Sequence, residues 1–217
     1  MLRLRTALLV SLVLLIASTR GTADMIFIAN ITPDQEVPPV GPGTTRPLLD
    51  DQNNPRPTSF GFATFVLNDA RTSLTYSATV FNIDFTGMQT PNINRDNLTA
   101  AHIHAPALPG VSAGVVFGFF GTPFNDNNPN DVVVTPFTTG VGGTITGKWD
   151  LNEGNNTTLT AQIANILAGR AYINFHTVQF PGGEIRGQIV PEPSTLTLAA
   201  LGAVGLVGYR WRQRKTT

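Results

Sequence analysis

Three histidines are the residues of this 217-residue chain best suited to bind a metal ion. His102 and His104 stand two positions apart in the segment AAHIHAPALPG, and His176 lies in the segment YINFHT. Three imidazoles are sufficient protein ligands for zinc or copper, with a fourth position left for water or a carboxylate. Glu184 is the acidic residue nearest to His176 in sequence, and we expect it to support the imidazoles from outside the ligand set.

Both histidine segments have the alternation of β-strands, in which residues two apart point to the same face. His102 and His104 therefore share one face of the first segment. The opposite face of this segment carries the apolar residues Ala101, Ile103 and Ala105. In the second segment, Tyr172, Asn174 and His176 share one face, and the apolar residues Ala171, Ile173 and Phe175 share the other. If the two strands are neighbours, the three imidazoles converge.

A polar cluster without metal is the alternative interpretation of the histidines. In it, the imidazoles form hydrogen bonds with Glu184, Arg186 or backbone groups and organise the edge of a sheet. The pattern favours this alternative, because no fixed spacing joins its two halves as in known metal motifs. Convergence of three ring nitrogens to within ~4 Å of one point would instead favour a metal.

Other chemistry has weaker support in the sequence. The chain has no Gly-x-Ser-x-Gly motif to present a nucleophilic serine, so we predict that it is not an enzyme. Acidic and amide side chains between Asn125 and Asp131 could supply oxygen ligands to calcium, but their spacing matches no known calcium loop and favours a polar turn. Cysteine does not occur, which excludes thiolate metal sites and disulfides.

The charge of the middle of the chain argues against a nucleic-acid partner. Residues 24–190 contain seven Lys and Arg side chains and thirteen Asp and Glu side chains. A surface of this net sign offers no attraction for phosphate backbones.

The elements that must position the histidines are short strands. With 21 glycines, 16 prolines and few charged residues, the composition favours strands joined by turns. Residues 157–167 are the one segment with helical spacing. The strands are predicted at 25–31, 60–67, 74–80, 99–104, 114–120, 132–134, 144–151, 170–177 and 184–190. This pattern predicts an all-β antiparallel sandwich with one short helix, and the phenylalanines Phe60, Phe62, Phe65 and Phe175 are candidates for its core.

The first 23 residues have the order of a secretory signal peptide. Arg3 and Arg5 precede an apolar stretch from Ala7 to Ala17, and small residues follow up to Ala23. We expect a signal helix and cleavage after Ala23, with an uncleaved anchor as the alternative. Either way, the middle of the chain leaves the cytoplasm.

The last 27 residues, 191–217, form a second targeting segment. Pro191, Glu192 and Pro193 precede an apolar run, 196–209, and a basic cluster made of Arg210, Arg212, Arg214 and Lys215. A 14-residue run spans about 21 Å as a helix, which makes it a short transmembrane helix against a hydrocarbon core of about 30 Å. The basic cluster would anchor its end on the cytoplasmic side.

This ordered arrangement resembles the PEP-CTERM sorting signal of Gram-negative bacteria. The resemblance implies transient retention in the inner membrane, cleavage near Pro191–Pro193 by an exosortase-type membrane protease, and then release to the cell surface or the exterior. A permanent tail anchor is the alternative for a segment of this marginal length.

The middle of the chain, 24–190, is similar to the CHRD domain, first described in chordin. The motifs that carry the similarity are Gln35–Pro39, Gly61–Ala63, Leu74–Tyr76, Ala101–His104, Ala168–Thr177 and Pro181–Gln188. The resemblance implies an immunoglobulin-like β-barrel in extracellular proteins, without catalysis. A long loop, 41–57, and a Pro- and Asn-rich segment, 125–130, depart from the family pattern.

Together these features predict an exported protein of the cell envelope or extracellular matrix with a non-catalytic binding or structural domain. Its expected partners are the exosortase-type protease and, beyond it, exopolysaccharide or surface proteins, and no cofactor is expected. The alternative function is copper or zinc binding at the three histidines.

Overall fold

The computed structural model describes residues 24–192 and Val204. The expected signal helix, the expected C-terminal transmembrane helix, Pro193 and the basic residues Arg210, Arg212, Arg214 and Lys215 lie outside the described residues. Within the described part of the chain, no helix has the length and apolarity to cross a bilayer.

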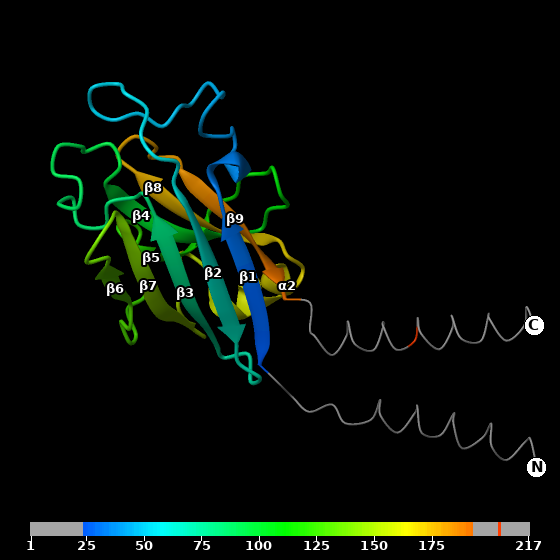
Figure 1. Ribbon diagram of the computed structural model, residues 1–217. Helices are drawn as coiled ribbons and strands as arrows, with labels where there is room; N and C mark the ends of the chain where they lie inside the picture. Colours follow the sequence, from blue (N-terminus) through cyan, green and yellow to red (C-terminus); the bar gives the residue numbers. More distant parts are fainter. Residues whose placement is uncertain (1–23, 193–203, 205–217) are drawn as a thin grey trace, which may run out of the picture.

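Over residues 24–192 the chain is an all-β fold with a single α-helix, as predicted (Figure 1). Its strands are β1 (Met25–Ile31), β2 (Phe60–Leu67), β3 (Ser73–Phe81), β4 (Leu98–His104), β5 (Val115–Phe120), β6 (Val133–Pro136), β7 (Gly142–Asp150), β8 (Ala171–Thr177) and β9 (Ile185–Pro191). A 3-10 turn, η1 (Pro33–Gln35), follows β1, and α2 (Leu159–Leu167) precedes β8.

All strand pairs are antiparallel, and the described strands form one curled sheet in the order β5-β4-β8-β9-β1-β2-β3-β7-β6. The junction between its halves is short: Phe27 pairs with Pro191 and Ile28 with Val190. The N–H of Glu192 also donates to the carbonyl oxygen of Ile26 at 3.0 Å. Because β1 and β9 are antiparallel neighbours, the start of β1 and the end of β9 lie at the same end of the domain (Figure 1).

The core lies between the two halves of the curled sheet. Phe117 on β5 stacks on Trp149 of β7 with ring centroids 4.8 Å apart, and Phe119 packs against Tyr76 at 4.8 Å. All four side chains are at most 1% exposed. Close packing of large aromatic side chains from both halves holds the two halves of the curled sheet together.

The prediction of a core position is wrong for two of the four phenylalanines. Phe65 and Phe175 are buried, but Phe60 and Phe62 are 46% and 56% exposed. Strand β2 points Ala63, Phe65 and Leu67 inward, and its other face, with the two exposed rings, points to solvent. Phe60 instead stacks on Phe81 of β3 on the outer surface, with centroids 4.8 Å apart.

The loop 41–57 is attached to the domain by buried residues. Leu48 packs with Val40 and Phe180 in a small apolar cluster of its own. Arg56, at the end of the loop, is 8% exposed and reaches Glu184. The insertion therefore covers one end of the sheet as a fixed part of the fold.

Candidate functional site

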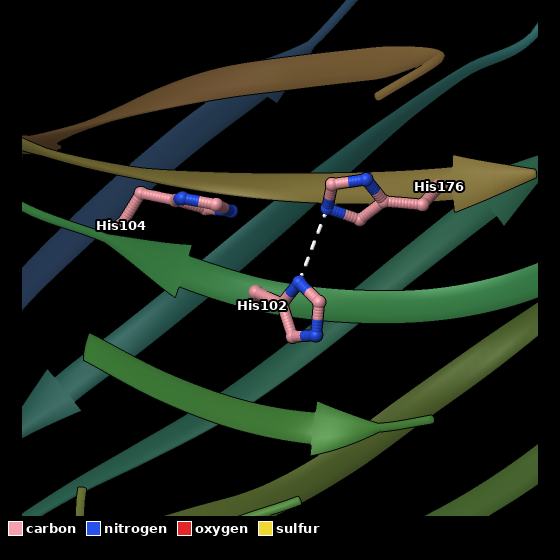
Figure 2. A group of neighbouring side chains, drawn as sticks. All are labelled: His102, His104 and His176. Atoms are coloured by element: carbon pink, nitrogen blue, oxygen red, sulfur yellow. Dashed lines mark hydrogen bonds between the residues drawn. The ribbon is translucent and has the colours of Figure 1, made fainter. Parts of the chain in front are cut away.

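Strands β4 and β8 bring the three histidines together. The two strands pair with His102 opposite Asn174 and His104 opposite Tyr172, while His176 lies opposite Ala100. This register places all three imidazoles on the outer face of the sheet, and Ala101, Ile103, Ile173 and Phe175 on the core face. Figure 2 shows the three rings turned toward one another from the two strands.

The ring nitrogens of the cluster lie somewhat further apart than in a formed metal site. One ring nitrogen from each histidine lies within 4.8 Å of the others, and the three side chains are 4–8% exposed. A zinc ion forms bonds of about 2.0–2.1 Å to imidazole nitrogens, so two ligand atoms can be at most about 4.2 Å apart. In a tetrahedral site the ligand atoms are about 3.4 Å apart, so the widest separation must shrink by more than about 1 Å on binding, while Nδ1 of His102 and Nε2 of His176 are already 3.1 Å apart.

Backbone carbonyl groups determine which nitrogen of each ring carries its proton. Nε2 of His102 donates to the carbonyl oxygen of Thr122 at 3.1 Å, and Nδ1 of His104 donates to that of Ala113 at 3.0 Å. Nδ1 of His176 donates to the carbonyl oxygen of Pro181 at 2.9 Å. Because a carbonyl oxygen only accepts, each of these nitrogens holds a hydrogen.

The other nitrogen of each ring then has a free lone pair. Nε2 of His104 is buried and has no hydrogen-bond partner in the described chain. With both hydrogens committed elsewhere, the 3.1 Å contact of His102 and His176 joins two lone pairs, which repel unless a proton or a metal ion lies between them.

Burial keeps the three imidazoles neutral. It lowers the pKa of His102 to about 3, with the neighbouring His176 and His104 adding to the effect. The pKa of His104 falls to about 4 and that of His176 also falls, in both cases mainly through burial. Neutral imidazole is the form that binds a metal.

A stack of aromatic and cationic groups holds His104. Its ring is parallel to that of Tyr172, with a 1° angle between the planes and centroids 4.7 Å apart. The guanidinium of Arg186 lies 3.5 Å from the centroid of Tyr172. The hydroxyl of Tyr172 accepts a hydrogen bond from the N–H of Ala113 at 3.2 Å. The carbonyl oxygen of the same residue accepts the hydrogen bond from His104.

Glu184 lies elsewhere than expected. It precedes β9 and is fully buried in an ion pair with Arg56, with Ser59 as a further partner. The hydroxyl of Thr177, on the strand face opposite His176, donates to Oε2 of Glu184 at 2.6 Å. In the described chain no hydrogen bond joins Glu184 or Arg186 to a histidine, so backbone carbonyls take the supporting position predicted for the carboxylate.

The segment 125–131 forms a polar turn. The N–H groups of Asn127 and Asn128 both donate to Oε1 of Glu153 at 2.7 Å, and the N–H of Asp131 donates to Asp126. Lys148 neutralises Asp131 in a salt bridge of 2.9 Å. Over residues 24–192, the three histidines are the only group of three metal-ligand side chains close enough to hold an ion.

Sequence comparison identifies two families along the chain. The CHRD domain model matches residues 27–189, about three quarters of the chain. The chain belongs to the CHRD domain family. This CHRD protein also matches the PEP-CTERM protein-sorting motif at residues 190–215. Neither the curated proteins nor the solved structures include a significant match.

The PEP-CTERM motif indicates export and membrane-associated sorting to the cell surface, with processing by an exosortase-type protease. Both families are non-catalytic. The structure places Pro191 in the last position of β9 and Glu192 directly after it, both exposed. The sorting motif therefore begins inside the folded domain, beside β1.

Proposed function

We propose that this exported CHRD protein binds one transition-metal ion, copper or zinc, through His102, His104 and His176. The observation that carries the proposal is the convergence of three ring nitrogens whose lone pairs are left free because each ring donates its hydrogen to a backbone carbonyl. A polar cluster without metal would instead have the buried lone pairs hydrogen-bonded, whereas Nε2 of His104 is buried without a partner in the described chain.

The ligand set suits copper or zinc. Imidazole nitrogens favour these ions over calcium or magnesium, which prefer oxygen ligands. The carbonyl partners orient the rings, as such partners do at known metal centres.

The test is metal analysis of protein purified without a histidine tag, stripped of metal and dialysed separately against copper and zinc. We expect about one equivalent bound per chain, and none in a His102→Ala/His104→Ala variant. Asp131→Asn is the matched control, because it changes the acidic turn and leaves the histidines intact. Equal, near-zero metal in the unaltered protein and the histidine variant would dispose of the proposal.

A binding or structural role in the cell envelope is the second candidate function, and the two roles are compatible. It is supported by the aromatic rows on β2 and β3, where the exposed rings of Phe60 and Phe62 lie beside the half-buried ring of Phe81. Exposed aromatic surfaces of this kind mark interaction sites. The proposed partners are envelope polysaccharide or surface proteins, reached after transient anchoring in the inner membrane of a Gram-negative cell, and retention of the mature domain on them is the test.

A further inference from the structure

Asn174 lies at the centre of the histidine cluster. It is opposite His102 on β4, and on β8 it stands two residues before His176 on the same face. His104 is diagonal to it, because His104 pairs with Tyr172, the preceding residue on this face. Side chains directly opposite in an antiparallel pair have Cβ atoms about 4.5–5.5 Å apart, and diagonal neighbours remain within reach of long side chains. The register therefore places the Asn174 amide among all three imidazoles.

The amide oxygen of Asn174 is an acceptor without a donor. The residue is 2% exposed, and its Oδ1 is buried without a hydrogen-bond partner in the described chain. Nε2 of His104 is in the same condition. A buried acceptor left unpaired costs about 1–3 kcal/mol. One metal ion bound by both atoms removes both penalties.

The surroundings of the amide on its other side determine which end faces the histidines. Asn174 also pairs with Arg186 on β9, the neighbour of β8 on the side away from β4. Ahead of β9, Oε1 of Glu36 is buried without a partner in the described chain, and it lies, like Oδ1 and Nδ2 of Asn174, 2.6 Å from the position that a Cβ of Gly183 would occupy. Nδ2 is the donor that can satisfy this oxygen, which turns Oδ1 toward β4 and the imidazoles.

We infer that Oδ1 of Asn174 is the fourth ligand of the metal ion, which is held in a closed site of three imidazoles and one amide oxygen. This inference rests on the proposed metal site and names its remaining ligand. Side-chain amide oxygens are known ligands beside histidines, as the axial Gln of some copper centres shows. Zinc sites whose four ligands all come from the protein are structural, whereas catalytic sites keep one position open for water. The ion therefore joins β4 to β8 and stabilises the fold.

The experiment loads the protein with cobalt(II), a coloured substitute for zinc, and adds azide as a probe for an open coordination position. A filled position leaves no place for azide, so we expect the visible spectrum of the unaltered protein to stay unchanged. Asn174→Ala removes the amide and opens the position. Its affinity for zinc should fall at least about tenfold, and azide should change its cobalt spectrum with saturation.

Asn174→Asp keeps an oxygen at the same place. It should bind zinc at least as tightly as the unaltered protein and show no response to azide. Zinc should also raise the midpoint of thermal unfolding of the unaltered protein more than that of Asn174→Ala, because the ion stabilises the folded state in proportion to its affinity.

The matched control is Asn30→Ala, the same change at an exposed position of β1. It should bind zinc like the unaltered protein and should not respond to azide. If azide changes the cobalt spectrum of the unaltered protein, or if Asn174→Ala binds zinc as tightly as Asn30→Ala, Asn174 is not a ligand and the three-histidine site stands. If Asn174→Asp loses as much affinity as Asn174→Ala, although both are folded by circular dichroism, the amide has a structural role only. If the unaltered protein retains neither copper nor zinc, the proposed function itself fails, and this inference with it.

Discussion

His104 and Tyr172 stack face to face across β4 and β8, with ring planes 1° apart. The tyrosine thereby fixes the plane of an imidazole whose Nε2 has no partner in the described chain. Replacing it should act on metal affinity through the histidine. For Tyr172→Leu we expect affinity for copper or zinc to fall about tenfold, a typical effect of removing a group that orients a ligand.

Tyr172→Phe is the control for this prediction, because it keeps the stacked ring and removes only the hydroxyl contact with Ala113. Its affinity should stay within about threefold of the unaltered protein. Isothermal titration against a competing chelator measures both variants. Equal losses in the two would assign the effect to the hydroxyl, and no loss in Tyr172→Leu would show that the stack does not position His104.

The buried pair of Arg56 and Glu184 should matter for stability and not for metal binding. Glu184→Gln leaves the guanidinium of Arg56 buried without its counter-ion, so we expect the free energy of unfolding to fall by about 3–5 kcal/mol. Lys148→Gln, which breaks two partly exposed ion pairs, with Asp131 and Asp150, should lower it by only about 1 kcal/mol. Urea unfolding measures both, and a tenfold loss of metal affinity in folded Glu184→Gln would show that the carboxylate does support the imidazoles.

Glu36 should make the metal-free domain less stable as the pH rises toward neutral. Burial raises the pKa of this carboxyl to about 7, against the opposing fields of Arg186 and Arg46. Folding therefore favours the protonated form, and the stabilisation is complete below pH 4.5 and is lost as the pH rises through about 7. The loss can reach about 3 kcal/mol.

Glu36→Gln isolates this contribution. The variant keeps an uncharged side chain at every pH, so its free energy of unfolding, minus that of the unaltered protein, should increase between pH 4.5 and pH 7. Asp96 and Asp126, whose pKa values burial raises to about 6, are present in both proteins and cancel in the difference. A difference that stays constant over this range would contradict the assignment.

The exposed rings on β2 test the envelope-binding role. Because Phe60 and Phe62 are about half exposed, a Phe60→Ser/Phe62→Ser variant should lose only about 1 kcal/mol of stability. If the aromatic rows bind envelope polysaccharide, this double variant should no longer retain the polysaccharide in pull-down assays. Val133→Ser, also at an exposed position, should bind normally, and unchanged binding by the double variant would remove the aromatic rows from the interaction.

The strand pattern made much of the fold predictable. Alternation within Ala101–Ala105 and Ala171–His176 assigned the imidazole face and the apolar face correctly, because side-chain direction in a strand is a local property. The same alternation left β2 ambiguous, since both of its faces carry phenylalanine. Only the curvature of the sheet decides that Phe65 is buried and Phe62 is exposed.

The partners of the histidines could not be predicted in the same way. The pairing of β4 with β8 is a contact between distant parts of the chain, and its register is set by the whole sheet. The carbonyl groups of Ala113, Thr122 and Pro181 come from loops whose backbone positions no residue type specifies. Tyr172 was on the predicted imidazole face, and this shared face was the available signal that it contacts a histidine.

The pairing of Phe27 with Pro191 determines how a precursor held at the bilayer would be oriented. The two ends of the described domain lie at one pole, so a precursor held through either end would have this pole nearest to the lipid. Ile185, which pairs with Phe175 next to His176, is six residues from Pro191, or about 20 Å along β9. The proposed metal site would thus lie about 20 Å from that pole, as far from the lipid in an anchored precursor as the length of β9 allows.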